Sequence, residues 1–458
     1  MSRHTEPRRP LILNAFEGNT VGNVQQGMWA HPRDDRLGFG SLKHWLDRAR
    51  RYEEARFDAV FFADVLGLYD TYRGSSAPAI ENAVEFPAHD PLTLIPAMAA
   101  VTENLGFVVT ASTSYEHPFA NARRWSSLDH LTGGRVGWNI VTSYLPSAAR
   151  NFGLTEQWSH DDRYDRAEEF LEISYKLWEK SWDEDAVVAD IQRSVYAEAD
   201  RIHAINHVGR TWSVAGPHLV EPSAQRTPLL FQAGTSGRGV QFAGKHAEVV
   251  FLGTNEAAGQ LKARENIEAA AVAAGRNPED VRLLGGLQVV VGKTHEQAQA
   301  RLEEYQNYLS REGALAHWCG VSGRDLDHYD EDTVFEKGDT DHVQTQAKRF
   351  SVEGGNARTV GQLKQHFGTL GSYVQPIVGT PEEVVDEIER RAIDGRIDGF
   401  NVQPIVQPET FDDFIEHILP RLRERGLARE SYGTSGLRER VFGSPRLPAT
   451  HPAHQVSI

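Results

Sequence analysis

Polar side chains gather at the end of one apolar stretch of this chain. Residues 135–141 are rich in β-branched and aromatic side chains and have the length of a buried strand. Asn139, Thr142 and Ser143 place an amide and two hydroxyl groups where that strand ends. Polar groups at the carboxyl ends of buried parallel strands are the groups with which α/β barrels bind ligands. Thr142 and Ser143 would also suit the cap of a following helix, so the spacing alone leaves both interpretations open.

Two other predicted strands also end in polar groups. Asp64 is the last residue of the apolar stretch 57–64, and Thr110 lies near the end of the stretch 107–112. In a barrel, the carboxyl ends of all strands face one mouth. We therefore expect both side chains to lie beside the polar groups that end the 135–141 strand.

A glycine-rich loop at residues 234–239, GTSGRG, follows the predicted strand 229–233 and precedes a helix. Its small residues, Ser236 among them, let backbone N–H groups approach a ligand, and a helix N-terminus attracts anions. The loop therefore indicates a phosphate site, although a tight turn has the same composition. His160 and Tyr164 are four residues apart at the start of another helix, so both lie on one face. Either of them alone would also suit a helix-capping cluster.

Stretches of strand length alternate with helical patterns along most of the chain. The eight predicted strands are residues 11–16, 57–64, 107–112, 135–141, 229–233, 248–252, 283–291 and 399–406. This alternation predicts a parallel sheet, and eight units without a dinucleotide-binding fingerprint favour a closed barrel over a Rossmann sheet. The predicted fold class is therefore α/β, a (β/α)8 TIM barrel with insertions.

A single domain accounts for most of the chain in this interpretation. We expect one TIM-barrel domain at residues 1–435, with insertions at about 182–226 and 313–358, where the alternation breaks. The second insertion is irregular in pattern, rich in Gly, Asp and His, and is a candidate lid over the barrel. Residues 436–458 form a tail that we expect to lie over the surface or over a partner.

The composition disfavours several classes of protein. A formal net charge of −16 over 458 residues argues against a protein that binds the phosphate backbone of nucleic acids. The only cysteine, Cys319, allows no internal disulfide and no Cys-based zinc site, and no H-E-x-x-H metal motif occurs. No apolar run reaches the roughly 18–20 residues of a membrane span. We therefore expect a soluble, cytoplasmic protein without a metal.

Three segments resemble a known enzyme family. They are GRVGWNIVTSYLPSAARNFG at 134–153, HDDRYDRAEEFLE at 160–172 and FQAGTSGRGVQFAGKHAE at 231–248. They resemble the bacterial-luciferase-like FMN-dependent monooxygenases, and within these the group of the nitrilotriacetate and dibenzothiophene-sulfone monooxygenases. The segments NAFEGNTVGNVQQGMW, FFADVLGLYDTYRG and TSYEHPFANARR are most similar to the long-chain alkane and dimethylsulfide monooxygenases. The resemblance spans residues 11–442.

The resemblance implies a TIM barrel that binds reduced FMN (FMNH2), delivered by a separate NAD(P)H-dependent flavin reductase. Such enzymes use O2 to place one oxygen atom on a substrate. The implied substrate here is a small or medium apolar molecule, either alkane-like or an organosulfur compound. The family also forms dimers and tetramers, so we expect a homodimer or homotetramer.

The resemblance also implies which residues hold the cofactor. The FMN contacts carried over are Asp64, Thr110, His160, Tyr164 and Ser236, all of which the strand ends and loops had already singled out. His160, Tyr164 and Ser236 would hold the phosphate, and Asp64 and Thr110 the ring or the ribityl chain. Asn139 and Ser143 would complete the floor of the flavin site.

A substrate pocket follows from the same resemblance. His317 and Tyr69 correspond to a histidine and a tyrosine at the active site of the alkane enzymes. Where those enzymes line the pocket with a cysteine, two histidines and a glutamine, this chain has Thr20, Asn23, Tyr144 and Glu85. We take His317, Tyr69 and Tyr144 as candidate catalytic residues and the other three as pocket residues. Compared with the alkane enzymes, this chain thus keeps the residues that would bind FMN but differs in the residues that would line the substrate pocket.

The leading hypothesis is thus a two-component FMNH2-dependent monooxygenase. One alternative is a deazaflavin-dependent dehydrogenase on the same barrel, which would need no O2. A second alternative is a non-catalytic flavin-binding protein, which would bind oxidised FMN tightly without oxygenating anything.

Overall fold

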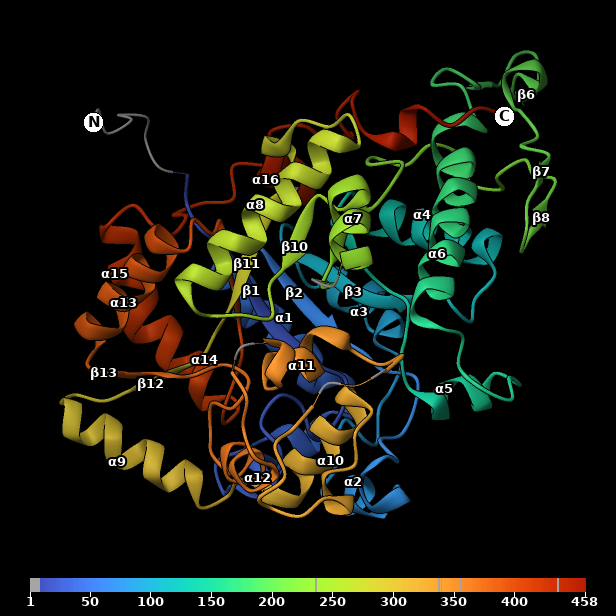
Figure 1. Cartoon of the computed structure of the whole chain (residues 1–458). Helices are drawn as coiled ribbons and strands as arrows, with labels where there is room; N and C mark the ends of the chain where they lie inside the picture. Colours follow the sequence, from blue (N-terminus) through green and yellow to red (C-terminus); the bar gives the residue numbers. More distant parts are fainter. Residues whose placement is uncertain (1–8, 235–236, 337, 339, 355, 435) are drawn as a thin grey trace, which may run out of the picture.

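The computed structural model describes residues 9–234, 237–336, 338, 340–354, 356–434 and 436–458. At its centre, eight parallel strands close into a barrel in the order β1-β14-β11-β10-β9-β4-β3-β2 (Figure 1). These strands are β1 (Ile12–Gly18), β2 (Ala59–Ala63), β3 (Gly106–Ser112), β4 (Val136–Val141), β9 (Leu229–Gln232), β10 (Val249–Phe251), β11 (Arg282–Leu287) and β14 (Gly399–Val402). The predicted (β/α)8 TIM barrel is confirmed.

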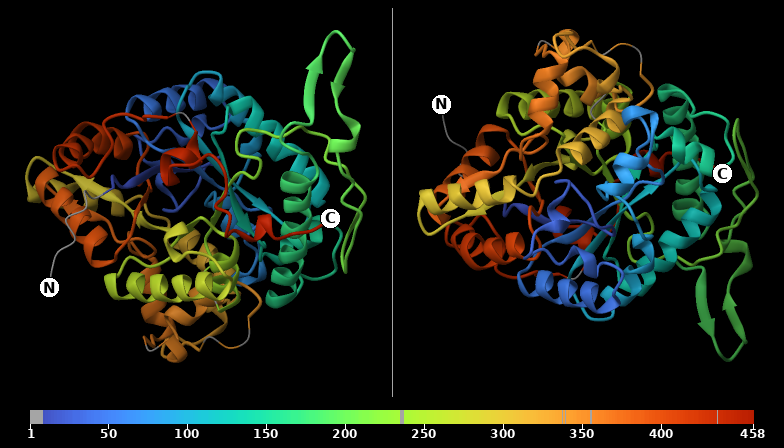
Figure 2. Two further views of the ribbon diagram at one scale, coloured as in Figure 1. Left: turned by 90° about the horizontal axis from the view of Figure 1, so that it is seen from above. Right: turned by 90° about the horizontal axis from the view of Figure 1, so that it is seen from below.

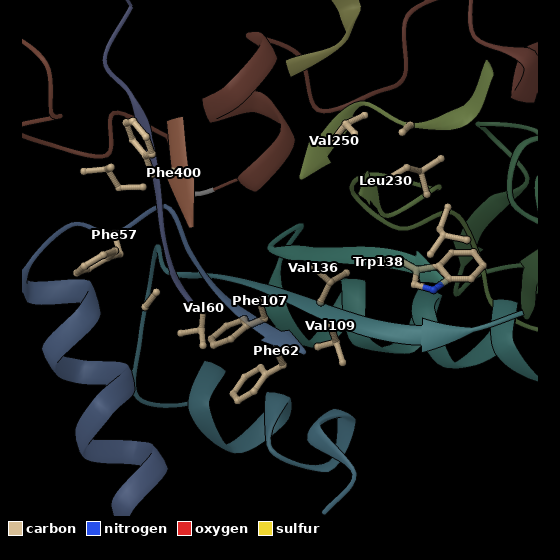
Figure 3. Packing of buried hydrophobic residues seen from close by; sticks show 14 of the residues in the cluster. Phe57, Val60, Phe62, Phe107, Val109, Val136, Trp138, Leu230, Val250 and Phe400 are labelled. Carbon is tan, nitrogen blue, oxygen red and sulfur yellow. The ribbon is translucent and has the colours of Figure 1, made fainter. Parts of the chain in front are cut away.

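Side chains of each strand alternate between the barrel interior and the layer of helices, as the two-residue period of a strand requires. On β2, Phe61 points inward and packs with Phe16 and Phe231. Its neighbours Val60 and Phe62 point outward into the cluster shown in Figure 3. Both faces of the strands are thus buried, which explains their near-continuous apolar sequences.

A ring of helices covers the barrel from outside (Figure 2). It comprises α1 (Leu42–Glu54), α3 (Ile95–Ala99), α4 (Pro118–Thr132), α6 (His160–Tyr175), α7 (Gly237–His246), α8 (Ala257–Ala273), α13 (Pro381–Asp394), α14 (Glu409–Asp413) and α15 (Leu419–Glu424). The start of α13 follows directly from its sequence. Thr380 accepts a hydrogen bond from the Glu383 N–H, and the Glu383 carboxylate accepts one from the Thr380 N–H, a complete capping box.

The segment at 182–226 forms two small antiparallel hairpins. Strands β5 (Val187–Asp190) and β6 (Val195–Ala197) make the first, and β7 (His207–Val208) and β8 (Ser213–Val214) the second. They project from the flank of the barrel beside α6 rather than over its mouth (Figure 2).

A second group of elements lies at the mouth of the barrel (Figure 1). It contains α2 (Ala77–Glu81), α5 (Pro146–Asn151), α9 (His295–Gln306), α10 (Arg311–Ser322), α11 (Gln344–Arg349), α12 (Val360–Phe367) and the parallel pair β12 (Val289–Val291) and β13 (Ile377–Gly379). The irregular pattern expected at 313–358 is therefore wrong for its first part, which is the buried helix α10. Gly320 explains this packing, because a Cβ there would lie 2.3 Å from a ring carbon of Tyr69.

The predicted strand at 283–291 is two strands, β11 of the barrel and β12 beyond it.

The C-terminal tail also differs from the expectation. Its helix α16 (Leu437–Phe442) places Leu437 and Val441 in the same cluster as the inward-facing barrel residues. Part of the tail therefore closes the amino-terminal end of the barrel instead of lying over the surface. Among the helices of the described residues, none has the length and apolarity needed to cross a membrane.

Candidate active site

A cavity of about 410 Å³ opens at the carboxyl ends of the barrel strands. Residues after β2 and within β3, β4 and β9 form its inner part, and residues of α6 and α10 form its sides. Three aromatic side chains, Phe16, Phe61 and Phe251, line its floor. Phe16 and Phe61 stack with their ring centroids 5.4 Å apart. The cavity is thus apolar below and polar at the strand ends.

The polar groups at the strand ends are connected to each other. The Asn139 side-chain amide donates to the Thr110 hydroxyl oxygen at 2.9 Å, and the Thr110 hydroxyl donates to the Phe62 carbonyl at 2.8 Å. The Asn139 Oδ1 atom is buried and has no hydrogen-bond partner among the described residues. Because a buried carbonyl oxygen normally has a partner, this atom fits a ligand that donates a hydrogen bond.

Ser143 follows β4 with a backbone φ of 51°, in the left-handed region that non-glycine residues rarely adopt. Its hydroxyl donates to the Ser112 Oγ atom at 2.8 Å, and both residues line the cavity. The next helix, α5, has Leu145 at its N-cap without a side-chain cap. The interpretation of Thr142 and Ser143 as helix caps is therefore wrong, since both face the cavity.

Asp64 lies just beyond β2, on the cavity wall. Burial, together with smaller contributions from the charges of Asp90 and Glu85, raises the pKa of its carboxyl group to about 7. At neutral pH a large fraction of this carboxyl group is protonated. In that form it can donate a hydrogen bond as well as accept one.

His160 and Tyr164 both line the cavity from the first turns of α6, as their spacing predicts. Their ring centroids are 5.1 Å apart. Helix α6 begins there because the Ser159 hydroxyl accepts a hydrogen bond from the Asp162 N–H. Gly234 faces this helix closely, since a Cβ at that position would lie 2.7 Å from the Tyr164 hydroxyl oxygen. Ser236, the fifth predicted FMN contact, lies outside the described residues.

The outer part of the cavity carries a second hydrogen-bonded group. The Tyr69 hydroxyl donates to Glu85 Oε2 at 2.8 Å and lies 2.9 Å from the Tyr144 hydroxyl. The His317 Nδ1 atom lies 2.9 Å from the Tyr373 hydroxyl. Burial, reinforced by the Glu85 charge, holds the pKa of Tyr69 and Tyr144 above the ordinary value, so both stay protonated.

Two of the predicted pocket residues do not reach the cavity. Thr20 and Asn23 are buried in the loop after β1 and are absent from the cavity lining. This loop turns back on itself, so that a Cβ at Gly18 would lie 2.9 Å from atoms of both side chains. The structure therefore separates them from Tyr69, Tyr144 and Glu85.

Sequence reasoning did not select five polar residues of the cavity lining: Ser112, Arg163, Gln232, His342 and Tyr373. Gln232 is a polar residue at the end of a predicted strand, so the criterion that singled out Thr110 would have found it. Arg163 lies between two residues that were selected. His342 and Tyr373 come from loops whose position depends on packing, and no local signal marks them.

Comparison with known proteins places this site in a family. The family described as luciferase-like monooxygenase matches residues 21–428. The chain belongs to this family, which confirms the resemblance of its three motifs. It is accordingly an oxidoreductase of the flavin-dependent monooxygenase class.

Relatives of known activity match almost the whole chain. The long-chain alkane monooxygenase of Geobacillus thermodenitrificans is 45% identical over 448 residues, covering 97% of each chain. The dimethyl-sulfide monooxygenase of Hyphomicrobium sulfonivorans is 41% identical, covering 98% of this chain and 94% of the relative. Among solved structures, a riboflavin lyase with modified FMN and riboflavin has a TM-score of 0.93 at 38% identity. That match covers 98% of this chain and 100% of the other.

Proposed function

We propose that this chain is the oxygenase of a two-component system. It binds FMNH2 from a separate NAD(P)H-dependent flavin reductase and uses O2 to oxygenate a small or medium apolar substrate. One observation carries the proposal. A single cavity gathers every predicted FMN contact that lies within the described residues, together with Tyr69, Tyr144 and His317.

The polar groups of the cavity fit a flavin. Asn139 Oδ1 and Gln232 Oε1 are both buried in the cavity lining without a hydrogen-bond partner among the described residues. A flavin ring and its ribityl chain carry N–H and O–H donors for such acceptors. The bare backbone at Gly234 lets the Gln232 amide and the Tyr164 hydroxyl lie where a Cβ would otherwise stand, so both can face the same ligand.

The proposed roles divide along the cavity. His160 and Tyr164, beside the Gly234 backbone, would hold the phosphate, because a ring N–H and a hydroxyl can both donate hydrogen bonds to an anion. Asp64 and Thr110 would hold the ring or the ribityl chain, with Asn139 and Ser143 on the floor. The apolar aromatic floor would keep water away from the reaction.

Reduced flavin supplies the electrons that activate O2, so the protein needs few acid–base groups of its own. The residues around the substrate would mainly position it. His317 would hold a proton on its imidazole while the Tyr373 hydroxyl orients the ring at Nδ1. Asp64, with its pKa near 7, would take up or release a proton at its carboxyl oxygen beside the flavin.

The substrate class, assembly and location are part of the proposal. The similarity to a long-chain alkane monooxygenase and a dimethyl-sulfide monooxygenase supports a substrate that is alkane-like or an organosulfur compound. We also propose a homodimer or homotetramer acting in the cytoplasm, where NAD(P)H supports the reductase.

The test is a coupled reaction of the protein with a flavin reductase, FMN, NADH and a panel of alkanes, sulfides and amines under ¹⁸O2. We expect one ¹⁸O atom in the product and the other in water. Riboflavin in place of FMN should lower the rate, because it lacks the phosphate that the α6 end of the cavity would bind. Turnover without O2 would instead support the deazaflavin-dependent dehydrogenase. Tight binding of oxidised FMN in the absence of any turnover would support the non-catalytic flavin-binding protein. The close monooxygenase relatives favour neither alternative.

A further inference from the structure

We propose that the substrate of this enzyme carries one ammonium group on its apolar body, and that Glu85 binds this group. The inference rests on the proposed function and narrows its substrate class. It follows from the hydrogen bonding, the aromatic surroundings and the backbone of Glu85.

The Glu85 carboxylate lacks partners for a group so deeply placed. Its side chain is 19% exposed, lines the cavity and accepts one hydrogen bond, from Tyr69 to Oε2. Oε1 accepts none from the described residues, and its nearest basic atom there is His317 Nε2 at 3.7 Å. Neither a Lys nor an Arg of the described residues forms an ion pair with it. A carboxylate has about four acceptor positions, so this one can still accept hydrogen bonds from a group bound in the cavity.

The hydroxyl groups of Tyr69 and Tyr144 both donate toward this carboxylate. Tyr69 gives its only hydroxyl proton to Glu85, so the bond between Tyr69 and Tyr144 is donated by Tyr144. What the two tyrosines and Glu85 together offer to a ligand is therefore an acceptor at Glu85 Oε1, beyond hydrogen-bond distance of His317 Nε2 at 3.7 Å.

Aromatic rings surround the same position. Tyr69, Tyr144 and Tyr373 line the cavity, and the His317 ring centroid lies 5.0 Å from that of Tyr69 and 5.1 Å from that of Tyr373. Aromatic rings beside a carboxylate are the surroundings in which proteins bind ammonium groups. An alkane or a sulfide would fill the apolar part of the cavity but would donate no hydrogen bond to Glu85 Oε1.

The backbone of Glu85 adopts a conformation that is energetically unfavourable for a residue with a side chain. Its φ of 47° is in the left-handed region. The neighbouring chain maintains it, since the Glu85 N–H donates to the Gly22 carbonyl at 3.0 Å and Val84 pairs with Gly22. Such strain at a cavity residue supports a role in function rather than in stability.

The experiment measures binding to the flavin-free protein at pH 7.5 by calorimetry, with hexylammonium, 1-hexanol and hexanoate as probes. We expect hexylammonium to bind roughly 10- to 100-fold more tightly than 1-hexanol, as a hydrogen bond to a charged group allows. Hexanoate should bind most weakly of the three. Equal affinities for hexylammonium and 1-hexanol in the wild type would overturn the proposal without any variant.

Variants then assign the preference to Glu85. Glu85→Gln should remove the preference for hexylammonium and keep 1-hexanol binding, whereas Glu85→Asp should keep the preference. Glu81→Gln, an exposed carboxylate on α2, makes the same change in net charge and should leave the preference unchanged. A preference that survives in Glu85→Gln would overturn the assignment. The binding assay contains no flavin, so the two proposals can fail separately. A preference for hexylammonium in a protein that does not bind FMNH2 would refute only the proposed function. FMNH2-dependent turnover in a protein without this preference would refute only the present inference.

Discussion

At the scale of the residue, burial decides the charge of Asp64. An aspartate in water is ionised at neutral pH, but this one lies in a cavity wall and its pKa is about 7. Between the ordinary pKa of 3.8 and pH 7, the folded protein keeps a proton that the unfolded chain has released. Protonation of Asp64 therefore contributes to the free energy of unfolding. This contribution is fully present below pH 3.8 and is lost as the pH rises through 7.

We therefore expect Asp64→Asn to change the pH dependence of stability. The wild type should lose about 1.4 kcal/mol per pH unit at this site between pH 4 and pH 7, about 4 kcal/mol in total, and the variant should lose none of it. Relative to the wild type, the flavin-free variant should thus gain stability from pH 5 to pH 8, measured by the midpoint of urea unfolding. Asp200→Asn, at an exposed carboxyl group, is the control. Parallel pH profiles for all three proteins would contradict the assignment.

At the scale of the element, Gly234 lets the chain after β9 pack closely against α6. Gly234 lies so close to its neighbours that a Cβ would be 2.3 Å from Gln232 Nε2 and 2.7 Å from the Tyr164 hydroxyl oxygen. Both neighbours line the cavity. A Cβ at Gly237, the first residue of α7, would meet no atom within 4 Å.

Gly234→Ala should therefore weaken the binding of reduced FMN. Displacing two cavity side chains costs about 1–3 kcal/mol, or roughly 5- to 150-fold in affinity. Anaerobic titration with FMNH2 measures this effect, and the thermal unfolding temperature shows that the variant is folded. Gly237→Ala should bind FMNH2 like the wild type. If Gly234→Ala and Gly237→Ala bound FMNH2 equally well, Gly234 would not be part of the flavin site.

At the scale of the whole molecule, the C-terminal tail completes the barrel. Arg438 is fully buried, and its guanidinium donates to Glu248 Oε1 at 2.8 Å and to Oε2 at 2.9 Å. It also donates to the Pro228 carbonyl at 2.9 Å, so it connects the tail to the strands β9 and β10. The tail thus belongs to the folding unit of the barrel.

Arg438→Met should destabilise the protein by roughly 3–5 kcal/mol, because it leaves the Glu248 carboxylate buried without its cation. Arg446→Met is the matched control in the same tail. Arg446 pairs with Glu184, whose side chain is 73% exposed, and such a pair contributes about 1 kcal/mol or less. Urea unfolding distinguishes the two variants, and a similar small effect of both would mean that the tail does not stabilise the barrel.

Local patterns in the sequence were enough to predict the barrel and much of the polar lining of its cavity. Apolar runs of strand length and the regular return of helices between them predict a closed parallel barrel. In such a barrel every strand ends at the same mouth, so Asp64, Thr110 and Asn139 meet there whatever the loops do. His160 and Tyr164 follow equally from the period of their helix.

Only the tertiary structure decided which loop residues share the cavity. Glu85 and His317 are far apart in the sequence and meet because α2 and α10 pack together at the mouth of the barrel. Thr20 and Asn23 turn back onto Gly18 and stay out of the cavity. The tail enters the barrel because Leu437 fills its amino-terminal end. These outcomes depend on close packing between distant segments, which no local periodicity records.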